Sequence, residues 1–357
     1  MKYLKQKTFK EMGIDWIGIE LTNTCNIRCT YCPVSYKEFQ QRSSNEKIMG
    51  YGLVEKIINE IGEDGSLDFV VLNYWGEPFL YPKFKDVLRL CRKKNIKMRF
   101  ATNGTLFNDE NISLVSRYEP DELVISIQYF MRENYEKVKG TKIHYDQWLN
   151  QIANFLKIMM NRETKTRIQL AIACNYNNGL RNKILGIRYG DKNLPYPNRS
   201  YFVKLDNFIK EFCEDRLHVL YNPDSTNRKR KKLIYDNYYN INENIAFELK
   251  TFSDSTNFYN FKENNQVDCF MPHINVNSKG EVVMCCEDYM GLTSIGNVKE
   301  KEIKETLIEN YDVILSKNNE KAKIEMCRKC YGERTYRGLL LRKCRNYLRK
   351  VKREYVG

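Results

Sequence analysis

The sequence predicts an α/β fold: a partial, TIM-like (β/α)6 barrel followed by a small C-terminal hairpin-plus-helix domain. Apolar strands alternate with amphipathic helices through the first 220 residues, and a hairpin pattern follows at about residue 274. Strand–helix alternation is typical of βα units arranged around a parallel sheet. Six such units are fewer than the eight of a closed barrel, so an open barrel is expected.

The expected elements can be followed along the chain. A helix over 51–62 is predicted from apolar residues three and four positions apart, and Gly62 is expected to end it. The predicted strands cover 17–22, 69–72, 97–101, 123–127, 167–173 and 218–220. The remaining predicted helices cover or include 84–91, 114–115, 148–160 and 201–212.

Residues 221–266 break this alternation and are interpreted as a linker or insertion. They contain many asparagines and a basic run at 228–232. The run is expected to be a solvated loop, with binding of an acidic substrate or partner as the alternative. The predicted organisation is therefore a partial barrel over 1–220, the linker over 221–266, and a cysteine-containing domain over 267–357 that ends in a basic helix.

Composition narrows the class of protein. The chain has 357 residues, twelve cysteines and a formal net charge of +14. It contains no apolar run of about 18 residues, so no membrane span is expected, and its first residues lack the apolar core of a signal peptide. Many cysteines without a secretion signal favour metal binding in the reducing cytoplasm over disulfides. The positive charge favours anionic substrates or partners.

Three cysteines, Cys25, Cys29 and Cys32, lie in one loop directly after the first predicted strand. Thiolates are the usual ligands of iron–sulfur clusters. Three local thiols leave one iron of a four-iron cluster without a protein ligand, and such an iron can bind a substrate or cofactor. A zinc knuckle is the alternative, although structural zinc prefers four ligands and no fourth Cys or His lies near this loop.

This cysteine spacing, with Tyr31 before the third cysteine, resembles the signature of the radical S-adenosylmethionine (SAM) superfamily. The resemblance implies that Cys25, Cys29 and Cys32 hold a [4Fe-4S] cluster whose fourth iron binds SAM. It also implies reductive cleavage of SAM to a 5′-deoxyadenosyl radical, which abstracts a substrate hydrogen. An electron donor such as flavodoxin or ferredoxin is then expected.

Further motifs follow the later strands at the edge where such sheets bind ligands. Gly76, Glu77 and Pro78 resemble the glycine–glutamate motif of the family, which implies binding of the SAM ammonium group. Glycine is expected there because it lets the main chain approach a ligand closely. The other residues that the resemblance assigns to SAM or its surroundings are Tyr31, Thr102, Asn103, Ser126, Gln128 and Asn175. Gln128 stands where the family often has Asp, and each polar residue could instead be a strand-end cap.

A second cysteine group lies in the C-terminal third. Segments 274–276 and 282–284 alternate around a turn and predict a β-hairpin. Together with Cys269, Cys285, Cys327 and Cys330, the hairpin resembles the SPASM extension of radical SAM enzymes, in its short twitch form. These four thiols are then implied to hold one auxiliary [4Fe-4S] cluster, with a zinc ribbon as the alternative.

Candidate catalytic residues lie beside this hairpin, which is expected to cover the barrel mouth. Cys286 could donate a hydrogen atom to a substrate radical, as in related epimerases, or be a small buried hydrophobe. Asp288 is the first candidate for a base, with Glu287 and His273 as further possibilities. Cys344 has no assigned role.

The predicted function is oxidation or epimerisation of a small polar, sugar-like or aminocyclitol-like substrate, by resemblance to twitch-type dehydrogenases. Modification of a peptide or protein, as in maturases of ribosomal peptides or of sulfatases, is the alternative. Only 24 residues precede Cys25, which leaves no room there for the usual peptide-binding domain. A non-enzymatic metal-cluster protein that binds nucleic acid is the alternative from another class, although nucleic acid is not the expected partner.

Overall fold

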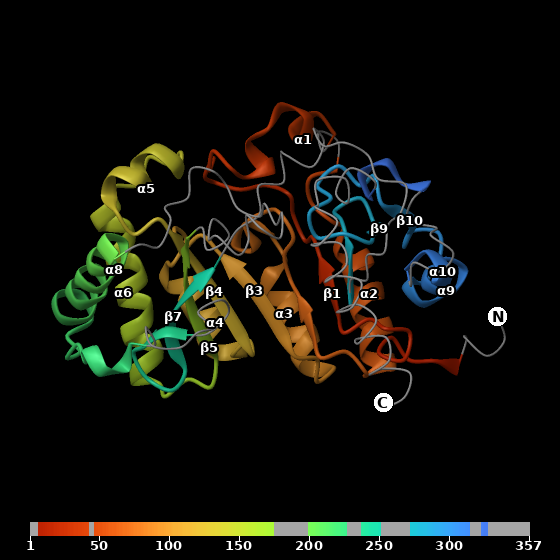
Figure 1. Cartoon of the computed structure of the whole chain (residues 1–357). Helices are drawn as coiled ribbons and strands as arrows, with labels where there is room; N and C mark the ends of the chain where they lie inside the picture. Colours follow the sequence, from red (N-terminus) through yellow and green to blue (C-terminus); the bar gives the residue numbers. More distant parts are fainter. Residues whose placement is uncertain are drawn as a thin grey trace.

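The computed structural model describes residues 6–42, 46–174, 199–226, 237–250, 272–314 and 323–327. Its centre is one ten-stranded sheet with the order β10-β9-β8-β1-β2-β3-β4-β5-β7-β6 (Figure 1). The strands are β1 (Trp16–Ile19), β2 (Phe69–Val71), β3 (Met98–Thr102), β4 (Glu122–Gln128), β5 (Arg167–Ala173), β6 (Asn237–Asn240), β7 (Ile245–Lys250), β8 (His273–Val276), β9 (Glu281–Val283) and β10 (Ser294–Asn297). The edge strands β10 and β6 do not pair with each other. The sheet therefore stays open, which confirms the predicted partial barrel.

Amphipathic helices pack against this sheet. They are α1 (Lys37–Arg42), α2 (Tyr51–Asp64), α3 (Phe84–Lys93), α4 (Asp109–Tyr118), α5 (Arg132–Val138), α6 (Tyr145–Asn161), α8 (Arg199–Glu211), α9 (Ile303–Glu309) and α10 (Tyr311–Ile314). Figure 1 shows α6 and α8 at one end of the sheet and α9 and α10 at the other. The buried faces of α2, α3 and α6 join the apolar strand residues in one continuous core. Helix α2 runs past Gly62 and ends at Gly65, whose φ of +65° suits a glycine.

The first five strands lie where the sequence predicts them, within a few residues. The sixth prediction, 218–220, was wrong. A π-helical turn (Phe212–Leu217) ends there at His218, which has a left-handed backbone conformation. The sixth parallel strand is β7, which pairs with β5. Part of the segment 221–266 therefore belongs to the sheet and is not a linker. Its asparagine and tyrosine content masked the alternation of buried Ile245, Phe247 and Leu249.

The predicted C-terminal hairpin is confirmed as β8 and β9. It does not stand apart from the barrel, because β8 pairs in parallel with β1, with Gly18 opposite Asn275. A Cβ atom on Gly18 would lie 2.2 Å from Oδ1 of Asn275, so a larger residue here would displace the Asn275 side chain. Strand β10 then extends the sheet beyond β9.

The sequence also predicts that no segment spans a membrane, that residues 228–232 form a solvated loop and that residues 333–355 form a basic helix. No helix in the described ranges is both long and apolar enough to cross a bilayer. The basic run 228–232 and the expected C-terminal helix over 333–355 lie outside the described residues.

Candidate functional site

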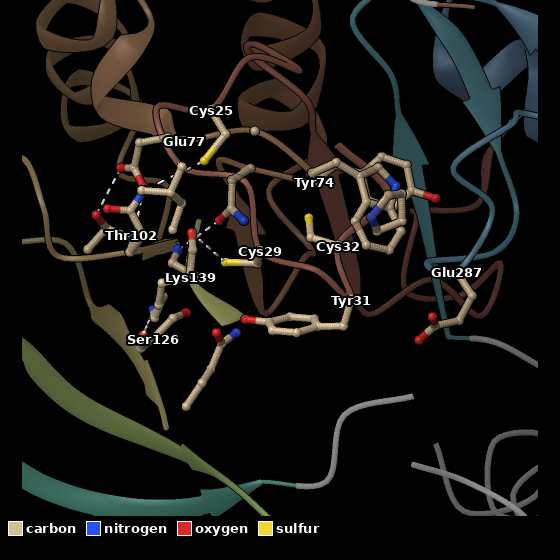
Figure 2. A pocket seen from close by; sticks show the side chains of 18 residues that line it. Cys25, Cys29, Tyr31, Cys32, Tyr74, Glu77, Thr102, Ser126, Lys139 and Glu287 are labelled. Carbon is tan, nitrogen blue, oxygen red and sulfur yellow. Dashed lines mark hydrogen bonds between the residues drawn. The ribbon is translucent and has the colours of Figure 1, made fainter. Parts of the chain in front are cut away.

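A cavity of about 270 Å³ lies between the cysteine loop and the carboxyl ends of the neighbouring strands (Figure 2). Parallel strands present their carboxyl ends at one edge of a sheet, so residues that follow β2, β3 and β4 meet there. The lining residues are Cys25, Ile27, Cys29, Tyr31, Cys32, Pro33, Asn73, Tyr74, Trp75, Gly76, Glu77, Ala101, Thr102, Asn103, Ser126, Gln128, Lys139 and Glu287. Ten of the residues that the sequence assigns to the cluster or to SAM are among them.

The cysteine loop is fixed by main-chain hydrogen bonds. The amide of Cys32 donates to the carbonyl of Cys29 at 3.0 Å, and the hydroxyl of Ser35 donates to the same carbonyl at 2.8 Å. The amide of Arg28 donates to the carbonyl of Lys139 at 3.2 Å. All three thiols line the cavity (Figure 2). They are therefore presented to one small volume.

Gly76 joins the loop after β2 to the chain that enters the cysteine loop. A Cβ atom at this position would lie 2.0 Å from the carbonyl oxygen of Thr22 and 2.8 Å from that of Thr24. The amide of Glu77 donates to the carbonyl of Thr24 at 2.8 Å. The close approach that requires glycine here is thus between two stretches of this chain, rather than between the chain and a ligand.

Glu77 is a buried carboxylate held from two directions. Its Oε1 accepts from the hydroxyl of Thr102 at 2.8 Å, and its Oε2 accepts from the amide of Asn103 at 2.9 Å. Burial raises the pKa of Glu77 to about 7, although these hydrogen bonds oppose the rise. A carboxylate in such a dry setting is strongly stabilised by a cationic partner.

Asn103 ties the end of β3 to the cysteine loop. Its side-chain amide donates to Oδ1 of Asn26 at 2.9 Å and approaches the sulfur of Cys25 at 3.6 Å. Its Oδ1 accepts from the amide and hydroxyl of Thr105. The indole nitrogen of Trp148 donates to the carbonyl of Asn103 at 3.0 Å. This network holds the wall of the cavity next to the first thiol.

Three lining residues carry buried polar atoms without a hydrogen-bond partner among the described residues. These atoms are the hydroxyl of Tyr31, Oε1 of Gln128 and Nε1 of Trp75. Gln128 has a φ of +57°, which is uncommon for a residue other than glycine. Such conformations gather at functional sites. Unpaired polar atoms on residues that line a cavity suit a polar ligand.

Lys139 is a lining residue that sequence reasoning missed. It follows α5, its side chain is almost fully buried, and its ammonium donates to the carbonyl of Ser126 at 2.7 Å. Burial lowers the pKa of Lys139, while the nearby thiols of Cys29 and Cys25 oppose that change. A lysine in a short polar helix gives no sequence signal of burial. The glycine that follows, Gly140, is the one sequence feature that indicates close packing at this point. Its φ is +53°, and a Cβ atom there would lie 2.3 Å from the carbonyl oxygen of Arg28.

The thiols lie in a setting that fits a cluster. Burial raises the pKa of Cys25 to about 11 and that of Cys32 to about 12. A thiolate there needs positive charge close by, and a metal centre supplies it. Among the described residues, no three His, Cys, Asp or Glu side chains converge as the ligands of a single metal ion do. A four-iron cluster takes one thiolate on each of three irons, so three thiols that line one cavity suit it.

Other predicted site residues lie elsewhere. Pro78 begins a 3-10 turn (Pro78–Leu80) beside the cavity without lining it. Asp288 is buried, and its Oδ2 accepts from the amide and hydroxyl of Thr293 at 2.6 and 2.7 Å, so it closes the turn after β9 instead of facing the cavity. His273 stacks on Trp16, with ring centroids 4.0 Å apart, at the opposite end of the strands.

The second cysteine group is described only in part. Cys285, Cys286 and Cys327 are partly buried and do not line the cavity. Cys269, Cys330 and Asn175 lie outside the described residues. Of the candidate bases, Glu287 alone lines the cavity, at its far side from Glu77 (Figure 2).

Comparison with known families matches two regions of the chain. The radical SAM superfamily model matches residues 19–170, which include the cysteine loop. The model of an iron–sulfur cluster-binding domain, SPASM, matches residues 269–331, which include the second cysteine group.

Individual relatives match more narrowly. The tungsten-containing aldehyde ferredoxin oxidoreductase cofactor-modifying protein of Pyrococcus furiosus is 31% identical over 32% of this chain and 30% of its own length. The antilisterial bacteriocin subtilosin biosynthesis protein AlbA of Bacillus subtilis is 26% identical over 43% of this chain and 32% of its own length. The chain thus spans about a third of the length of these curated relatives. The solved structure of Streptococcus suis SuiB bound to S-adenosylmethionine shares the fold, with a TM-score of 0.51 and 15% identity over 93% of this chain and 76% of that one.

Proposed function

Because the chain belongs to the radical SAM superfamily and carries a SPASM region, we propose that Cys25, Cys29 and Cys32 ligate its SAM-binding [4Fe-4S] cluster. The single observation that carries this proposal is the convergence of these three thiols on a cavity that also contains unpaired polar atoms. When bound and reduced, the cluster supplies the electron that cleaves SAM and generates a hydrogen-abstracting radical.

The residues of this chain have separate tasks in the proposal. Glu77 offers a desolvated carboxylate to the ammonium group of SAM, and Lys139 offers the opposite charge on the same wall. Gln128, and Ser126 on the same strand, offer polar groups to the sugar of SAM. Exclusion of water by Tyr31 and the buried surroundings strengthens each of these interactions.

We place an auxiliary [4Fe-4S] cluster on Cys269, Cys285, Cys327 and Cys330. The match of the SPASM model to residues 269–331 supports this placement. Two four-iron clusters correspond to about eight iron atoms per chain, whereas a zinc ribbon would leave about four.

For the substrate, we propose oxidation or epimerisation at a carbon of a small polar molecule that carries negative charge. The net charge of +14 supports an anionic ligand. Peptide modification is the second candidate, because one relative is named for the biosynthesis of a bacteriocin and matches 43% of this chain. SAM cleavage measured with added peptides and with added small anionic metabolites would separate the two substrate classes, because the true substrate class should increase the cleavage rate.

The test of the proposed chemistry is anaerobic reconstitution with iron and sulfide, followed by SAM and dithionite. We expect 5′-deoxyadenosine from the wild type. Cys29→Ala should form no 5′-deoxyadenosine from SAM and should contain about four fewer iron atoms per chain than the wild type. Cys91→Ala is the matched control, because Cys91 is a fully buried core residue of α3 and should keep both the iron and the activity.

The same experiment distinguishes the proposed enzyme from a non-enzymatic metal-cluster protein. A metal-cluster protein without enzymatic activity would bind iron and form no 5′-deoxyadenosine. That result, in preparations with full iron content, would contradict the proposed function.

A further inference from the structure

The C-terminal region contacts the cavity through the turn after β9. This turn begins at Cys285, and its Glu287 lines the cavity. The turn is closed on itself, because Asp288 accepts from Thr293 and the amide of Asp288 donates to the carbonyl of Cys285 at 3.2 Å. It therefore behaves as one compact segment, and its position depends on how it is held against the barrel.

Tyr74 provides that attachment. It lies in the loop after β2, and its hydroxyl donates towards two main-chain carbonyls of the turn, those of Cys285 at 2.8 Å and Asp288 at 2.9 Å. Tyr74 also lines the cavity. Figure 2 shows Tyr74 and Glu287 on the same side, away from Glu77 and Thr102. Burial raises the pKa of Tyr74 well above its usual value, so the hydroxyl stays a donor.

A small apolar cluster surrounds the same contact. The ring of Trp75 meets that of Tyr289 edge-on, with centroids 6.3 Å apart. Tyr289 also contacts Phe39 and Tyr36, which follow the cysteine loop. Cys25 and Cys32 belong to this cluster as well. One turn of the C-terminal region thus touches both the loop after β2 and the segment that carries the first three thiols.

We propose that Tyr74 is a positioning residue that fixes the turn 285–293 against the cavity, and thereby sets both the place of Glu287 at the substrate side and that of Cys285. A single hydroxyl contacts two carbonyls of the turn, so its removal leaves neither carbonyl with this donor. The part that concerns Cys285 as a cluster ligand rests on the proposed function. The part that concerns the turn itself does not.

The variant Tyr74→Phe removes only the hydroxyl. Amide hydrogen exchange in the apoprotein should become about tenfold faster in peptides covering 285–293, because the turn loses the donor that the carbonyls of Cys285 and Asp288 share. Tyr81→Phe is the matched control. The hydroxyl of Tyr81 is likewise buried and donates to the carbonyl of Met49 at 2.9 Å, away from the turn, so exchange over 285–293 should match the wild type.

A spectroscopic measurement separates positioning from loss of general stability. In the reconstituted, reduced protein we expect one electron paramagnetic resonance component that changes when SAM is added and one that does not. Tyr74→Phe should shift the SAM-insensitive component at unchanged iron content, because this component belongs to the cluster that Cys285 is proposed to ligate. Tyr81→Phe should shift neither component.

Two results would overturn the inference. One is wild-type exchange over 285–293 in Tyr74→Phe. The other is an equal effect of Tyr74→Phe and Tyr81→Phe on exchange or on the spectrum. Failure of the proposed function would look different, since the wild type itself would then form no 5′-deoxyadenosine, and the exchange comparison would still decide the role of Tyr74.

Discussion

Individual residues around the cavity join the loops and strand ends that form its wall. Gly76 and Asn103 connect the cysteine loop region to a neighbouring strand end: Gly76 packs closely against the main chain of Thr22 and Thr24, and Asn103 bonds to Asn26 through its side-chain amide. The carboxylate of Glu77 connects the loop after β2 to the end of β3. The site is therefore rigid in the sense that its ligands are set by packed loops.

Gly76 offers a direct test of this arrangement. Gly76→Ala places a methyl group against the carbonyl oxygen of Thr22, and main-chain atoms cannot give way as a flexible side chain can. We expect the free energy of unfolding to fall by about 1–3 kcal/mol and cluster loading to drop. Gly52→Ala, on α2 with no neighbouring atom within 4 Å, should instead raise the free energy of unfolding by about 0.5 kcal/mol. Denaturant titration measures both, and equal effects would contradict the packing described for Gly76.

Asp288 allows a structural role to be separated from the catalytic role that the sequence predicts. Asp288→Ala removes the acceptor of two hydrogen bonds from Thr293, so the free energy of unfolding should fall by about 1.5–3 kcal/mol. SAM cleavage without substrate should persist, because the carboxylate does not line the cavity. Unchanged stability with loss of substrate turnover would support a catalytic role instead.

The strands bring this site together. Residues far apart in sequence converge because parallel strands end at one edge, and this much was predictable from the alternation of strands and helices. The hairpin β8–β9 was predictable in itself, but its pairing with β1 was not, because such pairing spans more than 250 residues of chain. The result is that the C-terminal hairpin is an extension of the barrel sheet.

A double-mutant cycle tests the pairing of β1 with β8. Gly18→Ala should lower the free energy of unfolding by about 1–3 kcal/mol through its contact with Asn275. Asn275→Ala removes the obstructing amide, so the double variant should be more stable than the sum of the two single changes predicts, by about 1 kcal/mol. Strict additivity would show that the two side chains do not meet.

Most of the residues that line the cavity could be predicted from the sequence, whereas fewer of the contacts around it could. Cys25, Cys29, Cys32, Glu77 and Gln128 could be assigned because each stands in a motif or at a strand end. Lys139 and Tyr74 could not, since their roles arise from contacts between distant segments and neither lies in a recognisable pattern. Strand β7 was missed for a related reason, because its apolar alternation lies within a polar, asparagine-rich stretch.

The assembled chain thus joins a three-thiol loop, a strand-end cavity and a C-terminal extension in one sheet. The cavity beside the three thiols is also lined by the carboxylate of Glu77 and the ammonium of Lys139. In the proposal, the three thiols would hold the cluster and leave one iron for SAM. Binding of SAM to that iron is the central claim, and the ligand-binding roles proposed for Glu77 and Lys139 depend on it.

Electron–nuclear double resonance of the reduced protein tests this claim most directly, with SAM labelled with ¹⁵N in its amino group and ¹⁷O in its carboxylate. We expect both labels to couple magnetically to the cluster in the wild type, and neither to do so in Cys29→Ala. Absence of coupling in the wild type, with a cluster ligated by four protein donors, would contradict the proposed site.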